Sequence, residues 1–261
     1  MKVHKYKTVF ISDVHLGSRV CESDKLCEFL KENTCENLFL VGDIIDFWKL
    51  QRTIYWPQSH TNVIRRILTA SKRGTKVKYI LGNHDETLRD WIKNSELSLG
   101  NIELFNHFDY NTIKGKKILI THGDLFDGVI RHSKWLSVAG DRAYSALIHL
   151  NAILNKIRAL MGKEYWSLSS YIKINTKQAV AFVTSFEKHL IDHAKKEGYS
   201  GVLCGHIHSA SMQESNDFVY MNTGDWCETI SAIVEEYNGD FVLLVWNSRV
   251  GKLMEKARWV P

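Results

Sequence analysis

Side chains that commonly bind metal ions stand in five short clusters along this chain, and nearly every cluster directly follows a run of strand-forming residues. Carboxylate oxygens suit Mn, Fe or Mg, and imidazole nitrogens suit Fe, Zn or Mn. The five clusters together predict a site that two divalent ions share, which is a common arrangement for in-line attack on phosphorus. The candidate ligands are Asp13, His15, Asp43, Asn83, His122, His206 and His208.

The spacing within the clusters fits metal binding. Asp13 and His15 are two residues apart, so in an extended segment both side chains point the same way. His206 and His208 repeat this spacing. Asp43 is the candidate bridge between two ions, because a carboxylate offers two oxygens. An isolated Asp-x-His or His-x-His pair is a weak signal, but the full set in one chain is a specific one.

The two residues that directly follow Asn83, His84 and Asp85, are the candidate catalytic pair. His84 directly follows this neutral ligand and, if it faces the substrate, could stabilise the transferring phosphoryl group or protonate the leaving oxygen. Asp85 could orient His84 by accepting its other N–H. The alternative is a purely structural role for His84. Asp46 and Asp124 are expected to be partners of the ligand histidines and not ligands themselves.

Strand and helix signals alternate through the first 125 residues, which favours a layered α/β fold with strands buried under helices. In such folds the ligand site forms at the carboxyl ends of the strands. The loops that carry the five clusters are therefore expected to converge on one rim. Amphipathic helices are expected around residues 26–30 and 63–68. Strands are expected at 8–11, 38–41, 77–81 and 117–120, and a second sheet is expected to contain 202–204, 218–221, 231–234 and 241–246.

Residues 130–197 break the alternation with two long apolar stripes at helical spacing. We therefore expect a helical cap inserted into a catalytic domain made of residues 1–129 and 198–261. Residues 130–200 hold 11 Lys/Arg and 5 Asp/Glu, a balance of +6, which leaves 23 against 24 for the rest of the chain.

The cap sequence thus combines basic residues with more apolar surface than one helix seam needs, which favours a groove for an anionic and partly apolar substrate. An ordinary helix-pair core and a solvated basic face are the alternatives. The candidate substrate-binding residues are Arg131, Arg142, Lys156, Arg158, Trp135 and Tyr144.

The composition is that of a globular protein, with 44% hydrophobic and 24% charged residues. The five cysteines form no C-x-x-C pair, and the first residues contain no apolar stretch of signal-peptide length, so a cytoplasmic protein is expected. No uninterrupted apolar run approaches the ~18 residues of a membrane span.

The clusters resemble the signature of the calcineurin-like metallophosphoesterase family, which is D-x-H, G-D-x-x-D, G-N-H-D/E, a later H and G-H-x-H. The resemblance spans residues 13–208 and implies a four-layer αββα sandwich with two divalent metal ions, often Mn, with Fe, Zn or Mg as alternatives. The matching segments are Asp13-Val14-His15, Gly42-Asp43-Ile44-Ile45-Asp46, Gly82-Asn83-His84-Asp85, His122 and Gly205-His206-Ile207-His208.

Within this family the chain most resembles the UDP-2,3-diacylglucosamine hydrolase branch of lipid A biosynthesis. The features in common are residues 10–17, 43–48 and 222–226 with Glu228, and the helical insertion before the last His-x-His. That branch splits a pyrophosphate to give UMP and an acylated sugar 1-phosphate. The chain departs from the branch at His84, where the branch usually has Arg, and at 209–210, where it usually has Arg-Pro.

The resemblance implies a hydrolase in which a metal-bound hydroxide attacks the pyrophosphate of a lipid-linked nucleotide sugar. Such an enzyme is expected in the cytoplasm and peripherally at the inner membrane surface, with no nucleic-acid partner. One alternative is the same chemistry on a soluble nucleotide, a cyclic nucleotide or a phosphoprotein. Another is a non-catalytic scaffold that retains the fold, against which the intact ligand set counts.

Overall fold

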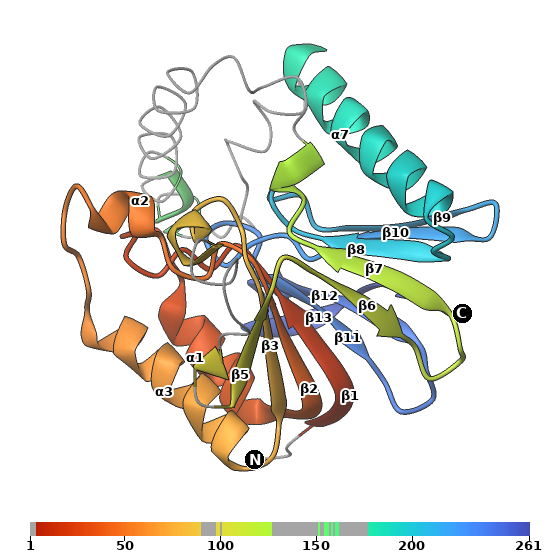
Figure 1. Ribbon diagram of the computed structural model, residues 1–261. Coiled ribbons are helices and arrows are strands. Elements are labelled where there is room, and N and C mark those ends of the chain that lie inside the picture. The colour runs from red at the N-terminus through yellow and green to blue at the C-terminus, as the bar shows by residue number, and fades with distance from the viewer. Residues whose placement is uncertain are drawn as a thin grey trace.

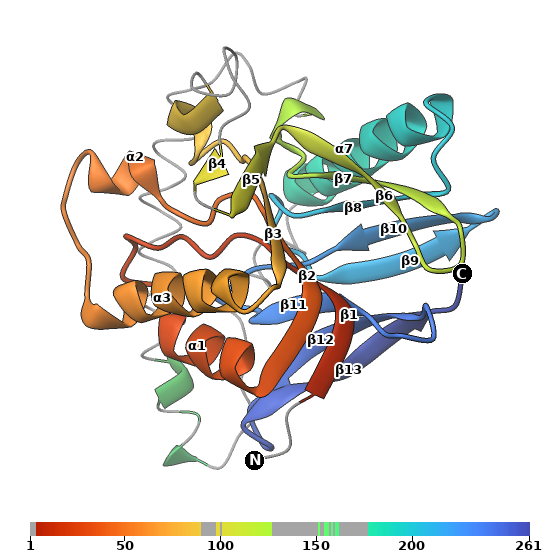
Figure 2. The ribbon, with the colours of Figure 1, turned by 60° about the horizontal axis from the view of Figure 1, so that its bottom comes forward.

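The computed structural model describes residues 4–89, 98–99, 101–126, 151, 154–156, 158, 160–161 and 177–261. In this part of the chain two β-sheets pack face to face, and helices cover their outer faces (Figure 1 and Figure 2). This arrangement is the four-layer αββα sandwich that the sequence predicts. Among the helices that the structure describes, none is long and apolar enough to cross a membrane.

The larger sheet has eight strands in the order β13-β12-β11-β1-β2-β3-β5-β4. The strands β1, β2, β3 and β5 are parallel, and the strands at both ends of the sheet run antiparallel to their neighbours. The bounds are β1 His4–Ile11, β2 Asn33–Val41, β3 Lys76–Ile80, β4 Ser98–Leu99, β5 Ile102–Phe105, β11 Ser231–Glu235, β12 Phe241–Asn247 and β13 Lys252–Trp259.

The smaller sheet has five strands in the order β6-β7-β8-β10-β9. Its three central strands β7, β8 and β10 are parallel, and the two edge strands are antiparallel to them. The bounds are β6 His107–Asn111, β7 Lys117–Thr121, β8 Gly201–Cys204, β9 Ser211–Ser215 and β10 Phe218–Asn222.

The helices divide between the two outer faces (Figure 2). Helices α1 and α3 pack on the larger sheet through apolar side chains such as Leu26 and Val63, and α7 packs on the smaller sheet through Phe186 and Leu190. The short α2 lies in the loop that follows β2. The bounds are α1 Ser23–Glu32, α2 Phe47–Leu50, α3 Gln58–Lys72 and α7 Lys177–Lys196, with 3-10 turns at Glu86–Leu88 and Asp124–Phe126.

Side chains along the central strands alternate between two hydrophobic cores. One core lies between the larger sheet and its helices, and the other lies between the two sheets. In β1, Val9 and Ile11 face the helices, whereas Phe10 faces the second sheet. Successive strand side chains point to opposite faces, so an apolar run such as Val9-Phe10-Ile11 suits a strand covered on both sides. The Phe10 ring stacks on Phe39 with 5.1 Å between the ring centroids and contacts Tyr110 edge-on with 5.5 Å between the centroids. The contact with Tyr110 joins the two sheets.

The expected assignment of strands to sheets is partly wrong. Strands β11 and β12, expected in the second sheet, belong to the larger one, where β11 pairs antiparallel with β1 and places Val234 opposite Val9. Strand β7, placed with the first alternating run, belongs to the smaller sheet. Apolar content shows that a strand is buried, but it does not identify the neighbour to which the strand bonds.

Several elements were not predicted, and the cap is only partly described. The short or polar strands β4, β5, β6, β9 and β13 lack the long apolar run on which the expectation rests; β13, for example, reads KLMEKARW. Of the expected cap, the structure describes α7, on which Phe186, Leu190 and Ala194 are buried as expected, and a few positions between 151 and 161. The division into domain and cap stays a prediction.

Truncation of Phe10, which is fully buried between the sheets, is expected to lower the free energy of unfolding by about 3–5 kcal/mol, because Phe10→Ala leaves a cavity. Leu68→Ala on α3 is the control, because Leu68 is 49% exposed and surface changes stay within about 0.5 kcal/mol. Urea unfolding measures both. Equal losses in the two variants would contradict this account of the inter-sheet core.

Candidate metal centre

The loops that carry the seven candidate ligands meet at the carboxyl ends of β1, β2, β3, β7 and β8. The loops after β1 and β2 continue the strand pairing beyond the sheet. The amide of Asp13 donates to the Gly42 carbonyl at 3.0 Å, and that of His15 donates to the Asp43 carbonyl at 2.9 Å. This pairing holds two candidate ligand segments side by side.

The ligand segments have unusual backbone conformations. Eight non-glycine residues in the described ranges have positive φ, and five of them are candidate ligands. This left-handed region costs most residues about 1–3 kcal/mol and persists where the surrounding structure imposes it. The strain is therefore concentrated at the candidate site. The five are Asp13, His15, Asp43, His206 and His208.

Three groups of side chains in the described part of the chain have the composition and closeness of metal sites, and the third is His15, Asp46 and His84. In the first, Asp13, His15 and His208 have ligand atoms within 4.8 Å of one another, and Asp13 Oδ1 lies 3.2 Å from His208 Nε2. In the second, Asp43, His122 and His206 meet the same limit, and Asp43 Oδ2 lies 3.3 Å from His122 Nε2. Mixed carboxylate and imidazole ligands suit Mn, Fe or Zn.

The unpaired buried atoms of the site fit a bound cation. A buried polar atom without a partner is costly, yet Asp13 Oδ1, Asn83 Oδ1 and His122 Nε2 are buried and have no hydrogen-bond partner in the protein. His122 Nδ1 donates to the Val41 carbonyl at 2.9 Å, which leaves the Nε2 lone pair for a metal. The residues present therefore fit divalent ions.

The ionisation of the two site carboxylates, Asp13 and Asp43, also fits a bound cation. Burial opposes ionisation of Asp13, but the neighbouring His208 imidazole brings the pKa of Asp13 down to about 2. Burial opposes ionisation of Asp43 as well, yet His122 and His84 hold its pKa well below the usual range. The carboxylates are thus anionic at neutral pH and available to a cation.

Each of these two carboxylates also ties neighbouring loops together. Asp43 Oδ1 accepts the amide of His84 at 2.8 Å, and Asp13 Oδ2 accepts the amide of His206 at 3.0 Å. In each case the second oxygen faces imidazole nitrogens. The same two side chains therefore arrange the loops and present the candidate ligand atoms.

Glycine is required where these loops approach most closely. A Cβ on Gly205 would lie 2.4 Å from Asp13 Oδ2, and one on Gly82 would lie 2.2 Å from Asp43 Oδ1. Any side chain at these positions would push the carboxylates away from their places. Glycine therefore allows the backbone to approach the two carboxylates closely at both positions.

His84 is held by two neighbours. Its Nδ1 lies 2.9 Å from Asp46 Oδ1, and its ring lies against Trp48 with 4.3 Å between the centroids. The His15 and His84 imidazoles hold the pKa of Asp46 far below its usual range against the effect of burial, so Asp46 accepts and the Nδ1–H of His84 donates. His84 Nε2 then lies toward Asp43 Oδ2, at 3.9 Å.

Asp46 therefore has the role that was predicted for Asp85. Asp85 instead braces the loop after β2: it accepts the amides of Ile44 and Ile45 at 3.3 and 3.2 Å and the Tyr79 hydroxyl at 2.7 Å. Burial raises the pKa of Asp85 to about 7. Adjacency to His84 in sequence was misleading, because the Asp85 carboxylate bonds to backbone amides and to Tyr79 and not to the His84 ring.

The expected role of Asp46 as a partner of histidines agrees with its contacts, since Asp46 Oδ2 also lies 3.5 Å from His15 Nδ1. Asp124 differs. It forms a two-point ion pair with Arg89 at 2.8 and 2.9 Å, and Arg89 also donates to the Leu81 carbonyl. This pair joins the loops after β3 and β7, and neither composition nor spacing signalled it.

Two further residues near the site were not assigned a role from sequence. Trp48 lies against His84, and Lys49 lies 3.6 Å from Asp46 Oδ2. Their position two and three residues after Asp46, in the turn that Asp46 caps, is the signal that could have found them.

The structure describes two of the six predicted substrate residues of the cap. Arg131, Arg142, Trp135 and Tyr144 lie outside the described residues. Lys156 is exposed and Arg158 is partly buried. Their role stays a prediction.

Comparison with known proteins agrees with this geometry. The family model of calcineurin-like phosphoesterases matches residues 6–210, most of the chain. The chain belongs to this family. It is thus a metal-dependent hydrolase with His and Asp groups that could bind the ions.

The similar curated proteins are named UDP-2,3-diacylglucosamine hydrolase. One from Haemophilus influenzae strain PittGG is 26% identical over 258 residues, covering 91% of this chain and 97% of the relative. One from Neisseria meningitidis serogroup B is 24% identical over 249 residues, with coverage of 90% and 96%.

Solved structures with a similar fold include Vacuolar Protein Sorting 29 from Cryptosporidium parvum, at TM-score 0.48 and 12% identity, with 97% of each chain covered. Yfce, a phosphoesterase from E. coli, has TM-score 0.47 and 12% identity, again with 97% of each chain covered.

We expect Asp43→Ala to lose more metal than His208→Ala, because Asp43 is the candidate bridge between the two ions and His208 is a candidate ligand of one ion. Elemental analysis of purified protein loaded with Mn gives the stoichiometry. Equal losses in the two variants would contradict the bridging role, and a stoichiometry near zero in the wild type would contradict the two-metal site.

His84→Ala is expected to keep both metals and to lose roughly 10²–10⁴ in rate on a nitrophenyl diester, the usual scale for an acid–base side chain. His122→Ala is the matched comparison and should lose metal as well as rate, because its Nε2 is a buried unpaired atom of the site. If both variants lose metal equally, His84 is a ligand or a structural support.

Proposed function

We propose that this enzyme hydrolyses the pyrophosphate of UDP-2,3-diacylglucosamine or a similar lipid-linked nucleotide sugar, with two divalent ions, of which Mn is the expected one. The observation that carries the proposal is the paired set of ligand groups around Asp13 and Asp43, in a chain that is similar over nearly its whole length to curated proteins named UDP-2,3-diacylglucosamine hydrolase. When bound, the ions would polarise the phosphoryl group and activate water.

The protein's own groups have distinct tasks in this proposal. Asp13, His15 and His208 would hold one ion, and Asp43, Asn83, His122 and His206 would hold the other, with Asp43 between them. His84 is oriented by Asp46 and by the Trp48 ring. A proton held at His84 Nε2 would stabilise the anionic phosphoryl group or pass to the leaving oxygen.

The substrate also fits the expected place of action. An acylated nucleotide sugar lies at a membrane surface, so we expect the enzyme to work from the cytoplasm and to contact the inner membrane peripherally. The basic and apolar sequence of residues 130–197 supports this expectation.

We predict that UDP-2,3-diacylglucosamine is cleaved with a kcat/KM orders of magnitude above that for UDP-N-acetylglucosamine, because each acyl methylene that becomes buried contributes about 0.8 kcal/mol. Release of UMP by the Mn-loaded protein measures both rates. Asp43→Ala is the inactive control. Comparable rates on the two sugars would reject the lipid substrate and favour a soluble nucleotide, and no hydrolysis of any phosphoester would favour a scaffold.

A further inference from the structure

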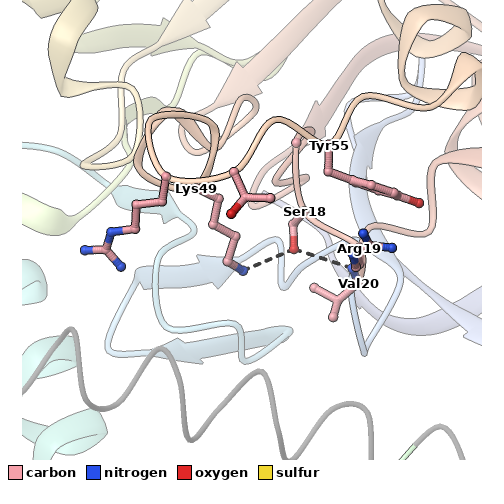
Figure 3. A pocket seen from close by; sticks show the side chains of 8 residues that line it. Ser18, Arg19, Val20, Lys49 and Tyr55 are labelled. Carbon is pink, nitrogen blue, oxygen red and sulfur yellow. Dashed lines mark hydrogen bonds between the residues drawn. The ribbon is translucent and has the colours of Figure 1, made fainter.

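A second feature lies beside the candidate metal centre. It is a pocket of about 280 Å³ between the segment that follows the Asp13–His15 loop and the segment around α2, shown in Figure 3. We call it the side pocket. Its lining residues are Gly17, Ser18, Arg19, Val20, Lys49, Arg52, Thr53 and Tyr55.

The side pocket is strongly basic. Arg19, Lys49 and Arg52 line it, and no carboxylate does. Such a cavity suits an anion. Arginine in particular presents a planar fork of donors that matches phosphate oxygens, and lysine adds a point charge.

Two of these cations are held in place by contacts visible in Figure 3. Lys49 donates to the Ser18 hydroxyl at 3.1 Å, and Ser18 is almost fully buried. The Arg19 guanidinium lies over the Tyr55 ring, 4.4 Å from its centroid. The pocket therefore combines oriented cations with an aromatic ring, the elements that bind the phosphate and the flat base of a nucleotide.

The side pocket is connected directly to the metal centre. The Ser18 amide donates to the His15 carbonyl at 3.0 Å. Lys49 lies 3.6 Å from Asp46, which contacts both His15 and His84. Two residues that line the pocket are thus bonded to residues of the candidate metal centre.

We propose that the side pocket binds the nucleoside phosphate half of the substrate, with Arg19, Lys49 and Arg52 on the phosphate and Tyr55 beside the base. This inference rests on the proposed function, because the substrate of that function carries a nucleoside diphosphate. Cleavage then leaves a nucleoside monophosphate in the pocket as the product.

The test uses the full-length Mn-loaded protein and its hydrolysis of bis(4-nitrophenyl) phosphate, with UMP, uridine and inorganic phosphate as inhibitors. We expect UMP to inhibit the wild type more strongly than uridine or phosphate. Arg19→Gln and Arg52→Gln should each raise the Ki of UMP about tenfold, the effect of losing one charge-assisted hydrogen bond. Tyr55→Leu should raise the Ki of UMP but not that of phosphate.

Arg65→Gln is the matched control, because Arg65 is an exposed cation on α3 outside the pocket lining, and it should keep the wild-type Ki. Each Ki is taken relative to the uninhibited rate of the same variant. A UMP Ki that is unchanged in Arg19→Gln and Arg52→Gln would overturn the proposal. An unchanged UMP Ki in Tyr55→Leu, together with equal effects of the two arginine variants on UMP and inorganic phosphate, would also overturn it and indicate a general phosphate site.

The proposed function can fail separately. If UDP-2,3-diacylglucosamine is not cleaved but UMP inhibition keeps this dependence on Arg19 and Arg52, the lipid substrate is wrong and the side pocket is supported as a nucleotide site for another substrate.

Discussion

The structure depends on the burial of two carboxylate charges, those of Asp13 and Asp43, at the ends of neighbouring parallel strands. Both side chains are almost fully enclosed, and buried charge is costly unless it is paired. Each charge is met by a backbone amide of another loop and by imidazoles. Divalent ions would complete this neutralisation, which explains why so many loops converge at one place.

The surrounding contacts make the arrangement rigid and connect it to its neighbourhood. Asp46 is the junction: it caps α2, holds His15 and His84, and lies beside Lys49 of the side pocket. Asp85 braces the same loop through the amides of Ile44 and Ile45. Sites supported by such a second layer of contacts keep their geometry better than sites on unsupported loops.

A feature could be predicted from the sequence where its physical cause is local in the chain. The strands that precede the first ligands were predictable because β1 and β2 each end in four consecutive buried residues, 8–11 and 38–41, nearly all of them apolar. The pairing of β11 with β1 was not predictable, because it depends on contacts between residues more than 200 positions apart. The five clusters were found from residue type and spacing. The sequence did not show that Asp46, and not Asp85, orients His84. That role depends on the direction in which each side chain leaves a turn.

The two sheets contribute different residues to the candidate ligand set. The order of these residues in the chain determines when the set is complete during synthesis. Asp13, His15, Asp43 and Asn83 follow strands of the larger sheet, whereas His122, His206 and His208 follow strands of the smaller one. During synthesis both carboxylates leave the ribosome well before the last two imidazoles. The candidate ligand groups around Asp13 and Asp43 therefore both stay incomplete until the smaller sheet docks, and capture of ions would be a late step that requires the whole sandwich.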